Sequence, residues 1–90
     1  MYSIEYTGLF IKQSIKCKKR GYNIDLLEDT IQLLADTGKL PPKYKPHKLI
    51  GKYTGCWECH IKPDWLLVWK QDDNKLILLF TNTGTHSDIF

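Results

Sequence analysis

An uninterrupted apolar run, Trp-Leu-Leu-Val-Trp at residues 65–69, constrains the fold more than any other part of the sequence. Successive side chains of a strand point to opposite faces, so Trp65, Leu67 and Trp69 share one face while Leu66 and Val68 share the other. A strand that is apolar on both faces is typical of a sheet covered on both sides. We therefore expect residues 65–70 to form a buried strand.

The residues before this strand predict a turn that carries reactive side chains. Pro63 has no amide hydrogen and restricts the residue before it to extended conformations, so it suits a turn or a strand edge. His60 and Asp64 lie on either side of Pro63. The strand that follows would hold both side chains rigidly, which makes this corner the first candidate for a functional site.

The composition predicts one small domain that comprises residues 1–90, with 42% apolar and 26% charged residues. No apolar run approaches the roughly 18 residues that span a membrane, and the first residues lack the pattern of a signal peptide. The cysteines number three, and an odd number argues against a disulfide framework. We expect a cytoplasmic protein with reduced thiols and no membrane partner.

The first half of the chain predicts a short strand at residues 3–6 and then two helices. The first helix runs from Leu9 to about Lys19, and the second begins after an N-cap at Asn23 and ends at Gly38. Their apolar sides are expected to be formed by Phe10, Ile11, Ser14, Ile15 and Cys17, and by Ile24, Leu27, Ile31, Leu34 and Ala35.

The second half predicts extended runs at residues 49–53, 56–61, 65–70 and 76–80, with a hairpin turn at 71–74. The order β-α-α-β-β-β-β predicts an α+β fold, in which a two-helix hairpin packs on one face of a twisted, mostly antiparallel sheet of four to five strands. The tail must fold back if Ile89 and Phe90 are to be buried. We expect the functional site on the opposite face of the sheet, near this tail.

Charge is unevenly distributed along the chain, although the net charge is only +3. Residues 12–20 are basic, residues 25–36 are acidic, and residues 39–70 are again mainly basic. The pattern is compatible with a solvated surface, and equally with a polyanion partner if the lysines gather on one face.

The side chains that could transfer protons are His47, His60, Asp64, His86 and, less plausibly, Glu58. Histidines in a basic domain suit phosphodiester cleavage, because imidazole changes charge near neutral pH and lysines neutralise phosphate. Any one of these histidines could simply be a surface or turn residue. Their clustering at strand ends and in the tail favours a shared role.

Cys56 and Cys59 have the C-x-x-C spacing of zinc and redox sites, with His60 and His47 as the further ligands available. On a strand, however, residues three apart point to opposite faces and do not share a metal. A small zinc or thiol protein is therefore the weakest alternative.

Three segments, residues 42–49 (PKYKPHKL), 59–68 (CHIKPDWLLV) and 83–90 (TGTHSDIF), carry a family resemblance. The chain resembles the YafQ-like toxins of the RelE/ParE superfamily, from bacterial type II toxin–antitoxin systems. The resemblance implies a RelE-like fold and an endoribonuclease that cuts mRNA in the ribosomal A site, where it also meets ribosomal RNA. It implies a cognate antitoxin protein, contact with operator DNA only through that antitoxin, and neither a metal nor another cofactor.

Carried over by position, the resemblance implies that His47, His60, Asp64 and His86 supply the acid and base groups. His86 would be the acid, and His60 or His47 the base, oriented by Asp64; which histidine is which stays open. The residues expected to contact or shape the bound RNA are Trp65, Phe90, Lys45, Lys52, Lys62 and Asn82.

Asn82 departs from the family pattern, since similar toxins have R-T-G-T-H where this chain has N-T-G-T-H. Either a lysine such as Lys52 or Lys62 replaces the missing arginine, or activity is weak. The alternative reading is a catalytically weakened member that acts mainly through antitoxin binding and operator repression.

Overall fold

The computed structural model describes all 90 residues and has the predicted order of elements, with a short helix added at the C-terminus. Two further single-turn 3₁₀ helices, η1 (Pro42–Tyr44) and η2 (Gly51–Tyr53), lie on either side of strand β2. The main elements are β1 (Ser3–Tyr6), α1 (Gly8–Lys19), α2 (Ile24–Thr37), β2 (His47–Lys48), β3 (Trp57–Lys62), β4 (Trp65–Asp72), β5 (Ile77–Gly84) and α3 (His86–Ile89).

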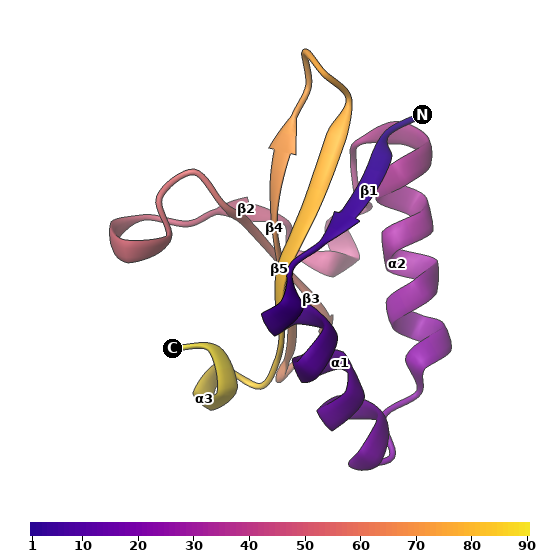
Figure 1. Cartoon of the computed structure of the whole chain (residues 1–90), viewed down its shortest axis with the longest axis vertical. Coiled ribbons are helices and arrows are strands. Elements are labelled where there is room, and N and C mark those ends of the chain that lie inside the picture. Colours follow the sequence, from indigo (N-terminus) through magenta and orange to yellow (C-terminus); the bar gives the residue numbers. More distant parts are fainter.

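The strands form one sheet in the order β1-β5-β4-β3-β2. β1 pairs with β5 in parallel, and all other neighbours are antiparallel. Helices α1 and α2 lie along one side of the sheet, while α3 and the C-terminus lie apart from them (Figure 1). The predicted α+β architecture, a helix pair on a mostly antiparallel sheet, is confirmed.

One predicted strand is wrong. Residues 49–53 were expected to be extended, but only His47 and Lys48 pair with β3, and Gly51–Tyr53 form η2. Gly51 has a φ of 72°, in the left-handed region that glycine adopts without strain and that a regular strand does not use. β2 is therefore a very short edge strand, and it serves mainly to place His47.

Strand β4 separates two apolar clusters, as its sequence predicts. Trp65, Leu67 and Trp69 pack with α1 and α2 in the larger cluster. Leu66 and Val68 pack on the other side in a smaller cluster with Cys56 and Ile89, the latter from α3. Burial of each such side chain contributes about 1.5 to 3 kcal/mol. The two layers hold β4, and with it the β3–β4 turn, in a fixed position.

Helix α2 matches its prediction closely. The Asn23 side chain accepts a hydrogen bond from the Asp25 amide at 3.1 Å, and Gly38 ends the helix in the left-handed conformation with a φ of 73°. A Cβ at position 38 would lie 2.6 Å from the Tyr2 ring, so this position also requires glycine for space.

Helix α1 departs from its prediction, because its buried face is narrower than the apolar pattern. Phe10 and Cys17 are buried, whereas Ile11 and Ile15 are 49% and 51% exposed. Gln13 lies between the two buried residues, and its side-chain oxygen accepts a hydrogen bond from the Thr83 amide at 3.0 Å. A polar contact with β5 thus sets the rotation of α1.

The tail folds back as predicted, but only in part. Ile89 is 8% exposed in the smaller apolar cluster, whereas Phe90 is 49% exposed. A capping box formed by Thr85 and Asp88 begins α3. None of the helices has the length and apolar character needed to cross a membrane.

Candidate active site

His47 and Glu58 form a cross-strand pair between β2 and β3. His47 Nε2 lies 3.1 Å from Glu58 Oε1, and His47 Nδ1 lies 2.8 Å from the Lys45 carbonyl oxygen. A carbonyl only accepts hydrogen bonds, so Nδ1 must carry a hydrogen. Nε2 can then bond to Glu58 only through a further proton between the two groups. The two groups are therefore placed so that they can share a proton.

The Glu58 side chain is only 8% exposed, and its second oxygen, Oε2, is buried without a hydrogen-bond partner. A buried carboxylate with one unsatisfied oxygen is costly, and such groups are commonest where function requires them. From the sequence alone, Glu58 was the least plausible of the residues that could transfer protons. Its available signal was its place on the polar face of an alternating strand, two positions before His60.

His60 follows Glu58 on the same face of β3. Its Nδ1 lies 3.2 Å from the Pro63 carbonyl oxygen, which places a hydrogen on Nδ1 and leaves the Nε2 lone pair of the neutral ring free. The His47 and His60 ring centroids are 6.2 Å apart. His60 Nε2 is thus without a partner within the chain, and the ring lies beside the His47–Glu58 pair.

Asp64 and His86 also meet, but through the backbone. The His86 amide donates to Asp64 Oδ1 at 3.1 Å, which ties the first residue of α3 to the β3–β4 turn. Asp64 therefore contacts the His86 backbone in this structure, and its role in orienting a histidine ring stays a prediction. The His60 ring is oriented by the Pro63 carbonyl, and the His47 ring by the Lys45 carbonyl and Glu58.

The His86 side chain is exposed and stands beside Phe90, with ring centroids 4.9 Å apart. Phe90 in turn packs edge-on against Tyr53 at 5.1 Å, and the Tyr53 hydroxyl donates to the Ile89 carbonyl at 3.0 Å. Because Tyr53 and Ile89 belong to the smaller cluster, α3 lies on the sheet face away from α1 and α2.

Asp88 fixes the orientation of α3. Its carboxylate accepts two hydrogen bonds from Arg20 and one each from Lys16 and the Thr85 amide, at 2.6 to 3.3 Å. The Arg20 guanidinium, with smaller contributions from Thr85 and Lys16, holds the pKa of the Asp88 carboxyl far below its ordinary value. This ion cluster links α3 to the C-terminal end of α1, two residues after His86 in the chain.

Trp65 and Asn82 lie deeper than expected of residues that contact RNA. Trp65 is 3% exposed and its indole N–H donates to Thr83 Oγ1 at 3.0 Å, so it supports the β3–β4 turn from the helix side. Asn82 is 6% exposed and faces Val68 across β4 and β5. Glu58 faces the same Val68 from β3, so Glu58 and Asn82 flank one residue on the face opposite α1 and α2.

The lysines are divided between two places. Lys52 lies with its ammonium 5.9 Å from the Tyr53 ring, near the tail. His60 instead lines a cavity of about 250 Å³ with three basic residues, Lys43, Lys45 and Lys62. Lys43 had not been selected from the sequence; it becomes a site residue because η1 turns back beside the β3–β4 turn.

The cysteines do not form a shared site. Cys56 packs in the smaller cluster and Cys59 in the larger one, on opposite faces of the sheet. Burial raises the pKa of the Cys59 thiol to about 12, which disfavours the reactive thiolate. No three His, Cys, Asp or Glu side chains are grouped as ligands for one metal ion.

Comparison with known proteins places this arrangement in a family. Residues 2–90 match the model of a family described as bacterial toxin of type II toxin–antitoxin system, YafQ. The chain belongs to the YafQ toxin family. Its similarity to the mRNA interferase toxin YafQ of Escherichia coli K12 is 38% identity over 88 residues, which cover 97% of this chain and 94% of the relative.

Solved structures of similar toxins share the fold over the full length. The E. coli toxin in the DinJ–YafQ complex is 35% identical and superposes with a TM-score of 0.90, covering 100% of this chain and 99% of that one. A metal-bound toxin from Helicobacter pylori is 37% identical with a TM-score of 0.91, and each chain is covered completely. The fold prediction from the sequence thus agrees with known YafQ structures.

Proposed function

We propose that this YafQ-family toxin is a ribosome-dependent endoribonuclease that cleaves mRNA and is neutralised by a cognate antitoxin. The observation that carries the proposal is the face shared by His60, with its free Nε2, and the His47–Glu58 pair in contact at 3.1 Å. Lysines line the cavity beside His60, as a substrate with a phosphate backbone requires. The similar E. coli protein is named an mRNA interferase.

In the proposed reaction, His60 Nε2 removes the proton from the 2′-hydroxyl of the substrate. The 2′-oxygen then bonds to the adjacent phosphorus, the bond from phosphorus to the 5′-oxygen breaks, and that oxygen needs a proton. We assign this proton to His86, because its exposed ring nitrogens make no hydrogen bond within the chain and are free to reach the leaving group. His47 remains engaged by Glu58 and stabilises charge.

The phosphorane carries an extra negative charge, and a preorganised cationic donor typically stabilises it by about 3 to 4 kcal/mol. Lys43, Lys45 and Lys62 are the candidates, because all three line the cavity that contains His60. Asp64 acts as a positioning residue, because it holds the backbone of His86 rather than a ring.

The mechanism uses no metal. Acid, base and cation are all supplied by side chains, and the residues present do not form a metal site, although a similar H. pylori toxin was crystallised with a metal. Toxin that has been treated with a chelator and dialysed should therefore cleave at an unchanged rate when it is added to untreated ribosomes.

A second candidate function is suggested by Asn82. A weakened enzyme would act chiefly through a toxin–antitoxin complex on operator DNA, with DNA contacts made by the antitoxin. The E. coli relative was crystallised with its antitoxin DinJ, which supports a partner of this kind for either function.

Mapping of mRNA 5′ ends separates the two functions. Induced expression should produce new 5′ ends within translated reading frames, and blocking translation should abolish them. The matched variant is His60→Ala, which keeps the fold and should produce no new ends. If wild-type and His60→Ala cells give the same 5′ ends, the nuclease proposal fails and the operator function is favoured.

A further inference from the structure

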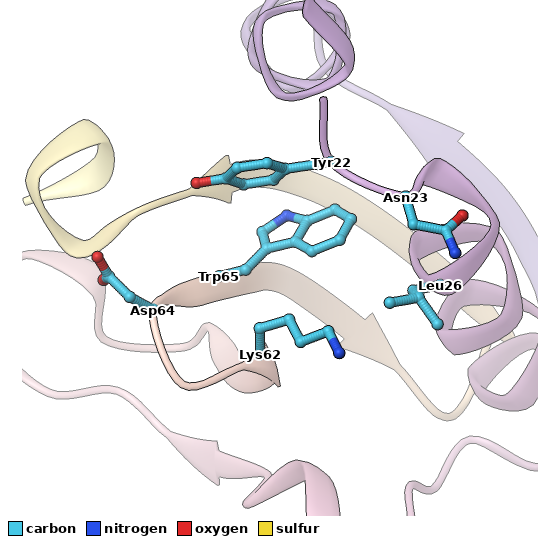
Figure 2. Close-up of a pocket in the computed structure, with 6 residues that line it drawn as sticks. All are labelled: Tyr22, Asn23, Leu26, Lys62, Asp64 and Trp65. Carbon is cyan, nitrogen blue, oxygen red and sulfur yellow. The ribbon is translucent and has the colours of Figure 1, made fainter. Parts of the chain in front are cut away.

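A cavity of about 310 Å³ opens beside Asp64, on the helix side of the β3–β4 turn. It is lined by Tyr22, Asn23, Leu26, Lys62, Asp64 and Trp65 (Figure 2). The Tyr22 ring lies over the Trp65 indole, with centroids 4.9 Å apart and planes at 57°. The cavity thus combines an aromatic wall with charged and amide groups at its rim.

This cavity continues into the groove that contains His60. Leu26 and Lys62 also line the adjoining cavity, whose further residues include His60, Lys43 and Asp29. Lys62, Lys43 and His60 then line the cavity that includes Lys45. A nucleic-acid strand that follows these cavities would pass from the aromatic wall to His60. On the way it would meet Lys62, Lys43 and Lys45.

The groups at the rim suit a nucleobase attached to a phosphate. The Asn23 oxygen is used by the Asp25 amide, so its –NH₂ group is available to donate. Asp64 can accept from an exocyclic amino group, and the Lys62 ammonium can pair with the phosphate. The ring available to a base is that of Tyr22, which is partly exposed and backed by the buried Trp65; stacking of a base on such a ring typically contributes about 1 to 3 kcal/mol.

We propose that the Tyr22–Trp65 cavity binds the base of an unpaired nucleotide adjacent to the cleaved phosphodiester. This subsite rests on the proposed nuclease function and adds a base-binding role for Tyr22, Asn23 and Leu26, none of which belongs to the acid–base group. RNA is favoured over a protein side chain as occupant because the groove that leaves the cavity carries three lysines against one acid, Asp29. The successive phosphates of an RNA strand would neutralise the charges of these lysines one after another.

The first test uses mRNAs on programmed ribosomes in which a single base flanking the cleaved bond is replaced by an abasic nucleotide. With the wild-type toxin, one flanking position should slow single-turnover cleavage by about fivefold to a hundredfold, the range expected of one lost base stack. Leu26→Trp, which fills the cavity, should slow cleavage of the intact mRNA similarly and remove the sensitivity to the abasic site. Leu33→Trp, on the exposed part of the same helix, is the matched control.

The second test does not depend on cleavage. Each of the four nucleoside 5′-monophosphates is titrated into the free toxin, and the Leu26 methyl and Trp65 indole N–H signals are followed by NMR. Shifts at both groups that are lost in Leu26→Trp support the subsite even if the ribosome assay shows no nuclease. Cleavage that is indifferent to every flanking base, with no such shifts, overturns it. A loss of antitoxin affinity in Leu26→Trp without either RNA effect also overturns it and assigns the cavity to a protein partner.

Discussion

Arg20 donates hydrogen bonds to both carboxylate oxygens of Asp88, from Nη1 at 2.6 Å and from Nη2 at 2.9 Å. The two residues are 68 positions apart in the chain. A two-point contact between a planar guanidinium and a carboxylate fixes orientation as well as distance. It therefore sets the angle at which α3 presents His86 and Phe90.

Arg20→Ala should reduce single-turnover cleavage by tenfold or more, because small displacements of a catalytic group are costly. Arg20→Lys keeps the charge but not the two-point contact, and it should recover only part of the loss. Lys18→Ala, on the same helix and outside the cluster, should leave the rate unchanged. Equal rates for Arg20→Ala and the wild type would show that α3 is positioned by its apolar contacts alone.

The lowered pKa of Asp88 predicts how its contribution to stability varies with pH. A carboxyl whose pKa is lower in the folded state stabilises the fold fully above its unfolded pKa, about 3.9, and the contribution is lost as pH falls toward the folded pKa. The difference in unfolding free energy between wild type and Asp88→Asn should be constant from about pH 7 to 5 and should shrink below about pH 4. Denaturant titrations across this range measure it; a difference that grows in acid would contradict the assignment.

Glu58→Leu should separate stability from activity. The substitution removes a buried carboxylate with one unpartnered oxygen, so the melting temperature should stay the same or rise. It also removes the carboxylate that contacts His47 Nε2, so cleavage should fall by about tenfold to a hundredfold. Glu5→Leu, at an exposed position on β1, controls for a general effect of charge. A lower melting temperature with unchanged cleavage would make Glu58 a structural residue only.

Asn82→Arg restores the residue that similar toxins have. Asn82 carries no charge, so the added cation should raise the cleavage rate, at most by the few hundredfold that one donor supplies. Asn82→Met is the matched neutral variant of similar length. If Asn82→Arg changes nothing and Lys62→Ala slows cleavage by a comparable factor, Lys62 already replaces the arginine.

Antitoxin should stabilise the toxin by mass action, by about 2.7 kcal/mol at a free concentration one hundred times Kd. The melting temperature of the toxin should therefore rise with antitoxin concentration. An unchanged melting temperature at saturation would exclude the partner. The melting temperature of the His60→Ala variant should rise with antitoxin as that of the wild type does. Because this variant should not cleave mRNA, it is suited to expression for the measurement.

The sequence was sufficient to predict elements whose local pattern agrees with their environment. The alternation in β4, the Asn23 N-cap and the Gly38 C-cap are examples, and each has the predicted role. The candidate histidines could be selected from the sequence because of their positions beside predicted strand ends and in the tail, and their roles stay predictions.

Features that depend on contacts between distant segments were missed. The side of α1 that is buried is set by Gln13 meeting β5, and the partner of His47 is set by the pairing of β2 with β3. The Tyr22–Trp65 cavity likewise joins the α1–α2 loop to the β3–β4 turn. No local pattern records such contacts, so neither the His47–Glu58 contact nor the contact of Asp64 with the His86 amide could be predicted from the sequence.

The place of β5 in the sheet has a consequence for how the newly synthesised chain folds. β5 is synthesised after every other strand, yet it lies between β1 and β4 and pairs with both. Until β5 has left the ribosome, β1 has no partner and the sheet lacks an interior strand, so the nascent chain cannot close its core. The core of this domain can therefore close only after all its other strands have been synthesised and β5 has emerged.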